Sequence, residues 1–224
     1  MRVGYQFRFD VVLTEWPWIA QGLGMTVTIA MLSMVLALPI GLGVAVMSLS
    51  RSRPVRLLAT FYVQVFRGVP LLVFIIWMHY GVSMATGVNF HPVAAGVLCF
   101  SLQYGSWLSE VFRGGIQAIG RGQREAAASL GLSQAQTFRH IIMPQAVRIV
   151  LPSTGNLFVG LLKDSSLVSV IGVFELMRQT QQAVSLTFRP FEFYTVTAGL
   201  YILLTFGVAR ALAVLERRLH VPGL

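Results

Sequence analysis

The stretch GLGMTVTIAMLSMVLALPIGLGVAVMSL, residues Gly22–Leu49, contains no charged side chain. A helix needs about 20 apolar residues to cross the hydrocarbon core of a bilayer, so this segment is long enough for one complete span. It is too long for the apolar core of a signal peptide, and Asp10 and Glu15 stand where such a peptide would be basic. We therefore predict a membrane protein whose first span lies in this stretch.

The composition excludes an ordinary soluble protein. Hydrophobic residues make up 55% of the chain and charged residues only 11%, and the mean hydropathy is +0.72. The 17 basic residues outnumber the 8 acidic ones, which in a soluble protein would suggest nucleic-acid binding. Here the arginines flank apolar runs, as in membrane proteins, so we expect no nucleic-acid partner. The single Cys99 lies in an apolar run and leaves neither a disulfide framework within the chain nor a thiol-rich metal site.

Apolar runs recur along the chain and predict an all-α membrane protein with about five transmembrane helices. The segment 87–92, rich in Gly, Asn and Pro, separates the second span from the third. The sequence 67–70 (RGVP) could be a hinge, since proline lacks a backbone donor, or the entry to a span, which we favour. We place the spans at about residues 22–49, 57–83, 92–113, 146–166 and 193–214, in one transmembrane domain over 22–219.

The placement of arginine sets the orientation of these spans. Two loops and the C-terminal end are rich in arginine, whereas acidic residues balance the arginines on the opposite side. We predict an extracytoplasmic N-terminal segment over 1–21, a cytoplasmic loop over 114–145 and a cytoplasmic tail over 220–224, in a multi-pass protein. The arginines on the cytoplasmic side are Arg51, Arg53, Arg56, Arg121, Arg124, Arg139, Arg148, Arg217 and Arg218.

A polar stretch, EAAASLGLSQAQTFRHIIMP, residues Glu125–Pro144, lies inside this apolar chain. It is either an ordinary solvated loop or a docking element for a soluble partner. Good helix formers, a glycine able to turn left-handed and a serine with glutamine three residues on predict two short helices. The expected elements are a helix over 123–130, a turn at Gly131, a capping box from Ser133 to Gln136, a second helix over 134–143, and Pro144 at the return to the membrane.

The spacing in this stretch resembles the EAA loop of bacterial ABC-importer permeases. The match comprises Glu125-Ala126-Ala127, then Gly131, Ile141 and Met143-Pro144, where the family usually has leucine before the proline. Further motifs are similar to the polar amino acid (histidine/glutamate/glutamine-type) branch and cover most of residues 61–219. They are FRGVPLL at 66–72, GGIQ at 114–117, GQ at 122–123, PQA at 144–146 and LKDSSLV at 162–168.

The resemblance implies a permease like those of type I ABC importers, in a bacterial inner membrane. The loop would insert into a cytoplasmic ABC ATPase dimer, which binds ATP and Mg²⁺. A second permease subunit, identical or homologous, and an extracytoplasmic solute-binding protein would complete the importer. The chain has no G-x-x-x-x-G-K-[ST] motif, so it would be a non-catalytic subunit without a cofactor of its own. The implied coupling residues are Glu125, Ala126, Ala127, Gly131, Ile141 and Pro144.

A second candidate site lies at Lys163-Asp164, in or near the fourth span. Charged groups at membrane depth normally face the protein interior or a pathway. The pair either lines a substrate path or serves packing, and no metal site is predicted. The candidate path residues are Lys163, Asp164, Ser165, Ser166, His79 and Gln103.

The expected cargo is a polar amino acid or a similar small zwitterion, such as a compatible solute. Two other classes compete with this interpretation. An ion-coupled secondary transporter usually has an internal repeat and more spans. A non-transporting membrane assembly subunit would leave Lys163-Asp164 unexplained.

Overall fold

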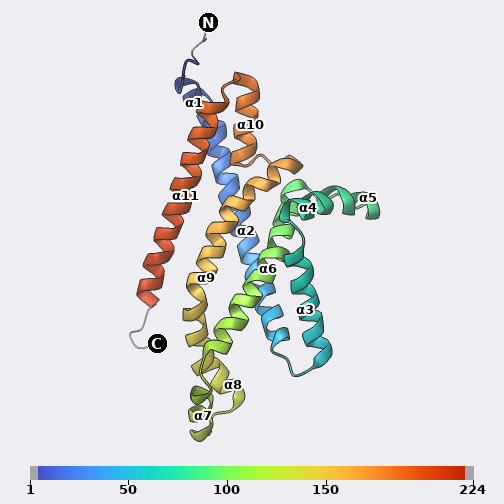
Figure 1. Cartoon of the computed structure of the whole chain (residues 1–224), viewed down its shortest axis with the longest axis vertical. Helices are drawn as coiled ribbons and strands as arrows, with labels where there is room; N and C mark the ends of the chain where they lie inside the picture. The colour runs from blue at the N-terminus through green and yellow to red at the C-terminus, as the bar shows by residue number, and fades with distance from the viewer. Residues whose placement is uncertain (1–4, 220–224) are drawn as a thin grey trace.

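The computed structural model describes residues 5–219, and every regular element in this range is a helix, which confirms the all-α class. Figure 1 shows an elongated bundle with the N-terminus and α10 at one end, here called the N-terminal end, and α7 and α8 at the other, the loop end. The elements are α1 (Asp10–Thr14), α2 (Trp16–Ser48), α3 (Arg53–Gly68), α4 (Leu71–Ile76), η1 (Trp77–Gly81), α5 (Val82–Thr86), α6 (Pro92–Ala118), α7 (Arg121–Ser129), α8 (Gln134–Thr137), η2 (Phe138–Ile142), α9 (Met143–Asp164), η3 (Ser165–Ile171), α10 (Leu176–Thr187) and α11 (Pro190–Leu219).

Helix α6 forms the centre of the bundle. It packs against α2, α3, α4 and α9, and its Phe100, Tyr104 and Leu108 side chains are fully buried. One apolar cluster joins buried residues of α2, α4, α6, α9 and η3. Because neighbouring helices surround α6, it can carry polar side chains without turning them to lipid.

The observed helices agree only in part with the five predicted spans. By length and composition, α2 and residues 190–218 of α11 could each cross a membrane, and two bent helix pairs raise the number to at most four. Helix α6 has 27 residues but is not in this group, because its polar residues lower its apolarity. Five spans and their boundaries stay a prediction. Helix α2 begins at Trp16, earlier than predicted, and the predicted tail 220–224 lies outside the described residues.

The predicted second span, 57–83, is not one straight helix. Helix α3 and the segment from α4 to α5 meet at 100°. Val69 at the break is extended, with φ −90° and ψ 128°, because a residue before proline avoids the helical region. Pro70 also has no N–H with which to continue the helix. A sharp bend therefore stands where we favoured a simple entry to the span.

Gly41 lets α2 and α6 approach closely. A Cβ at Gly41 would lie 2.6 Å from Leu108 Cβ and 3.0 Å from the Gly105 carbonyl oxygen, whereas a Cβ at Gly43 would meet nothing within 4 Å. We expect Gly41→Leu to lower the free energy of unfolding by about 1–3 kcal/mol through overpacking. The matched variant Gly43→Leu should not lower it, since leucine is the better helix former. Thermal unfolding in detergent checks this, and equal losses of stability would contradict the close contact.

Candidate functional site

Helix α7 ends in a Schellman motif at the loop end of the bundle. Leu130 is the C-cap, and Gly131 follows with φ +77°. The Gly131 N–H donates to the Ala128 carbonyl at 2.9 Å, and the Leu132 N–H donates to the Ala127 carbonyl at 3.1 Å, the two bonds that define the motif. The left-handed turn predicted at Gly131 is confirmed, and it redirects the chain from α7 to α8.

Helix α8 begins with the predicted capping box. Ser133 Oγ accepts from the Gln136 N–H at 3.3 Å, and Gln136 Oε1 accepts from the Ser133 N–H at 2.9 Å. The sequence predicted that this helix ends at Met143, but α8, η2 and α9 follow one another without a break. The wider π turn of η2 ends at Ile142, two residues before Pro144, and lets the helix continue past a residue without an N–H.

The predicted coupling residues divide into a buried and an exposed set. Glu125, Ala126 and Pro144 are exposed, Ile141 is half-buried, and Ala127 is 1% exposed. The exposed set faces away from the bundle and is free to contact a partner. A small apolar cluster at the base of the element holds it to α6 and α9; its members are Ile116, Ile119, Ile142 and Ala146.

Two large apolar side chains are exposed on the same element. Leu130 is 78% exposed and Phe138 is 40% exposed. Exposed apolar groups on an otherwise polar segment are typical of a protein contact surface. The sequence pattern did not single out either residue, although an apolar residue at the C-cap of a polar helix is the signal that could have done so.

Lys163 and Asp164 are adjacent in sequence but have different surroundings. Lys163 is exposed, whereas Asp164 is half-buried and accepts a hydrogen bond from the Tyr104 hydroxyl at 2.8 Å. Successive helical residues point about 100° apart, which explains the divergence. The structure therefore directs only Asp164 toward α6, and no sequence pattern pointed to its partner Tyr104.

Ser165 and Ser166 use their hydroxyl donors within the same chain segment. Ser165 Oγ donates to the Leu162 carbonyl at 2.9 Å, and Ser166 Oγ donates to the Lys163 carbonyl at 2.8 Å. Such local bonds to a carbonyl three residues back are common for serine in helices. The two serines keep acceptor lone pairs, but their donors are occupied.

Gln103 supports the bend between α3 and α4. Its Nε2 donates to the Val69 carbonyl at 3.1 Å, so it supplies a partner where the helix is interrupted. Gln103 Oε1 and His79 Nδ1 are buried without a hydrogen-bond partner among the described residues. His79 lies in η1 and stacks edge-on with Tyr80. Within residues 5–219, no hydrogen bond links His79, Gln103 and Asp164 into one cluster.

A fully buried carboxylate, Glu175, joins three helices at the N-terminal end. It caps α10 by accepting from the Met177 and Arg178 N–H groups, both at 2.8 Å. The Tyr201 hydroxyl of α11 donates to it at 3.1 Å, and Thr26 Oγ1 of α2 approaches at 3.5 Å. The sequence pattern did not single out Glu175; its position directly before a helix was the available signal.

A second buried carboxylate, Glu192, ties the N-terminal segment to the start of α11. It accepts from the Tyr5 hydroxyl and from the Arg8 N–H at 2.9 Å, and it pairs with Arg189 at 3.6 Å. Arg8 in turn pairs with Asp10 at 2.7 Å, and this hydrogen bond lowers the pKa of the Asp10 carboxyl. These charges are thus matched within the chain. In the described part of the chain, no group of three or more His, Cys, Asp or Glu could hold a metal ion.

The element formed by α7 and α8 lies inside the region that matches a known family. Residues 37–221 match the model of the binding-protein-dependent transport system inner membrane component family. The chain belongs to this family. Its members are permease components of ABC transporters, and membership together with the apolar helices identifies the chain as an integral membrane protein.

Individual relatives of this transport component agree with the assignment. It is 35% identical over 164 residues to the glutamine transport system permease protein GlnP of Escherichia coli K12, covering 73% of this chain and 75% of the relative. It is 40% identical over 152 residues to the arginine ABC transporter permease protein ArtQ of Haemophilus influenzae, covering 65% and 69%.

Solved structures confirm the type I permease fold. A chain of an amino acid ABC transporter crystallised with histidines is 37% identical, has a TM-score of 0.90, and is matched over 96% of this chain and 100% of that one. A chain of the methionine transporter MetNI, in an inward-facing form, has a TM-score of 0.77 over 91% and 96% of the two chains. At 18% identity, that second likeness concerns the fold alone.

Proposed function

We propose that this chain is the permease subunit of an ATP-driven, binding-protein-dependent importer of polar amino acids or similar small zwitterions. Family membership supports the transport role. The relatives named for glutamine and arginine, and the solved amino acid transporter, support the cargo class. The membrane would be the cytoplasmic membrane of a bacterium.

The observation that carries the proposal is the capped helix pair at the loop end. A Schellman motif and a capping box fix the turn between α7 and α8 through local hydrogen bonds, and a small apolar cluster holds the element to α6 and α9. The pair exposes Glu125 on α7, Leu130 between the two helices and Phe138 directly after α8. A rigid element with an exposed apolar tip is suited to insert into a groove of a soluble subunit. We assign that subunit as an ABC ATPase dimer, which would bind ATP and Mg²⁺.

The same element explains how a movement of the ATPase reaches the membrane helices. Because α8, η2 and α9 are continuous, a displacement of the tip acts directly on α9. Helix α9 ends at Asp164, which is hydrogen-bonded to Tyr104 of the central α6. Closure of the ATPase dimer would therefore shift α9 relative to α6 and change access to the region around Asp164. A second permease, identical or homologous, would form the other wall of the pathway.

The arginine distribution supports a cytoplasmic loop end and an extracytoplasmic N-terminal end. In that orientation the binding protein would dock near α1 and α10, at the opposite end from the ATPase (Figure 1). The extracytoplasmic protein would supply much of the selectivity, and the permease would supply the path.

A cysteine-labelling experiment tests both the orientation and the docking role. The native Cys99 is 0% exposed, so the background should be low, while Leu130 and Leu13 are 78% and 74% exposed. We expect a membrane-impermeant maleimide to label Leu13→Cys in intact cells but Leu130→Cys only after lysis. A short bifunctional reagent should join Leu130→Cys, but not Leu13→Cys, to the co-expressed ATPase. Labelling of Leu130→Cys from outside would contradict the orientation, and absence of the ATPase cross-link would contradict the docking role.

A further inference from the structure

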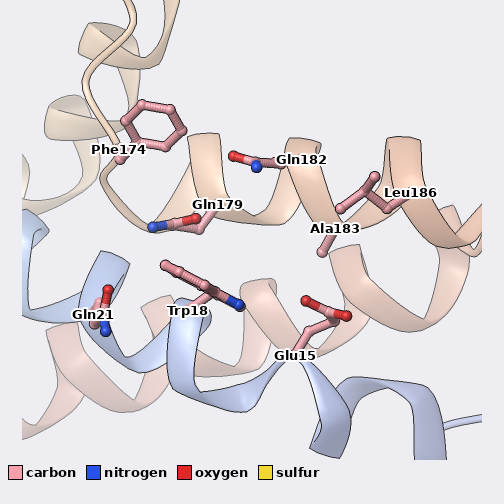
Figure 2. Close-up of a pocket in the computed structure, with 8 residues that line it drawn as sticks. All are labelled: Glu15, Trp18, Gln21, Phe174, Gln179, Gln182, Ala183 and Leu186. Atoms are coloured by element: carbon pink, nitrogen blue, oxygen red, sulfur yellow. The ribbon is translucent and has the colours of Figure 1, made fainter.

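A cavity of about 540 Å³ opens at the N-terminal end, between the start of α2 and α10 (Figure 2). Its volume falls within the range of about 300–1,000 Å³ typical of small-molecule sites. Besides Ala183 and Leu186, the lining gathers one carboxylate, three amides and two aromatic rings. These groups belong to Glu15, Gln21, Gln179, Gln182, Trp18 and Phe174.

The amide of Gln179 points into this cavity without a partner in the protein. Gln179 is only 8% exposed, and no hydrogen bond within residues 5–219 uses its side-chain amide. A Cβ at Gly22 would lie 2.8 Å from Gln179 Cγ, so glycine at this position leaves room for that side chain against α2. Figure 2 shows the amide directed toward Trp18 and the open space. The amide atoms of Gln179 are open to the space of the cavity, so their two donors and one carbonyl acceptor are available to a ligand there.

Helix α10, which carries Gln179, is fixed to α11 by hydrogen bonds. Glu175 caps the first turn of α10 and accepts from Tyr201 of α11 at 3.1 Å. Thr180 and Thr197 share a hydrogen bond of 2.6 Å between α10 and α11. One side of α10 is therefore fixed to the bundle while the adjacent side, which begins at Gln179, lines the cavity. Fixed elements of this kind hold binding groups in place before a ligand arrives.

The cavity has a negative end. Glu15 is its one charged lining residue, and its carboxylate neither caps α2 nor forms an ion pair with any described residue. The aromatic rings of Trp18 and Phe174 lie beside the same space and can face a cation. Arg178 lies over the Phe174 ring at 6.0 Å but is not part of the lining. An anionic ligand would therefore meet an unbalanced carboxylate.

We infer that this cavity is a binding site for a basic amino acid, such as arginine or lysine. The side-chain cation would sit between Glu15 and Trp18, and the amides of Gln21, Gln179 and Gln182 would hold the α-carboxylate. The site lies at the end of the bundle far from the α7–α8 tip. The inference rests on the proposed transport function and narrows it, because the site would receive basic cargo before it reaches Asp164.

Binding of radiolabelled arginine tests this site in the full chain, reconstituted with its ATPase in lipid nanodiscs without the binding protein. A charged hydrogen bond is involved, so Glu15→Gln should weaken binding by at least about tenfold, and Gln179→Leu should weaken it as well. Unlabelled lysine should compete, and glutamate should not. The matched controls Asp10→Asn and Gln181→Leu, at the same end but outside the lining, should bind as the unaltered chain does.

Arginine binding that is unchanged in both cavity variants would overturn the inference. A second combination of results would also overturn it: the unaltered chain does not bind arginine, and Glu15→Lys no longer binds the binding protein. A basic side chain of the binding protein, and not an amino acid, would then occupy the cavity. Uptake by the complete ATP-fuelled transporter is measured in parallel. Intact uptake without arginine binding in the cavity overturns the site alone, whereas no uptake by the unaltered transporter overturns the proposed function.

Discussion

Replacing Leu130 by aspartate should abolish the stimulation of ATP hydrolysis by substrate-loaded binding protein. Leu130 is 78% exposed at the tip of the α7–α8 element, so its substitution should not affect the fold of the permease. Docking would bury this side chain in the ATPase groove, and burying a carboxylate there without a partner is strongly unfavourable. We expect at least a tenfold lower stimulated rate, measured as phosphate release by the reconstituted complex.

The conservative variant Leu130→Met separates docking from a general effect at this position. Methionine keeps the volume and the apolar character, so stimulation should stay close to that of the unaltered protein. If Leu130→Asp hydrolyses ATP at the normal stimulated rate, the tip does not enter the ATPase and the α7–α8 element has another role.

Removing the charge of Asp164 should lower uptake by about 10- to 100-fold at limiting substrate, the loss expected for a hydrogen bond to a charged group. Asp164→Asn keeps the size of the side chain and an oxygen that can accept from Tyr104. The charge is what the ammonium of an amino acid would contact. Initial rates of uptake into proteoliposomes measure the effect.

The matched variant Tyr104→Phe removes the hydrogen bond but leaves the Asp164 charge. If Asp164 serves the substrate, Asp164→Asn should be the more severe change. If it serves only packing between α6 and α9, Tyr104→Phe should be at least as harmful and Asp164→Asn should be nearly silent. Lys163→Gln, at an exposed position, should have little effect in either case.

The local structure of the loop element was predictable because its determinants are close together in the sequence. Gly131 needed no distant partner to adopt φ +77°, and the bonds between Ser133 and Gln136 join residues three apart. The all-α class followed from the apolar runs that recur along the chain, which are also a local property of the sequence. The structure of a short segment can be predicted from its sequence when the hydrogen bonds that stabilise it lie within the segment.

The candidate pathway and the cavity depend on contacts between distant segments. Asp164 meets Tyr104 only because α6 and α9 pack together, and Glu15 and Gln179 share a cavity only because Gly22 lets α10 pack closely on α2. The spacing of apolar and polar residues along the chain does not predict which distant residues come into contact. The bend at Pro70 was partly predictable. The proline marked the position of the bend, but the sequence did not give its angle of 100°.

Uptake into proteoliposomes that contain this permease, its ATPase and the binding protein tests the central claim most directly. With arginine or glutamine outside and ATP inside, we expect accumulation against a gradient that stops when a non-hydrolysable ATP analogue replaces ATP. Accumulation that continues without ATP hydrolysis, driven by a proton or sodium gradient, would contradict the account and favour an ion-coupled transporter.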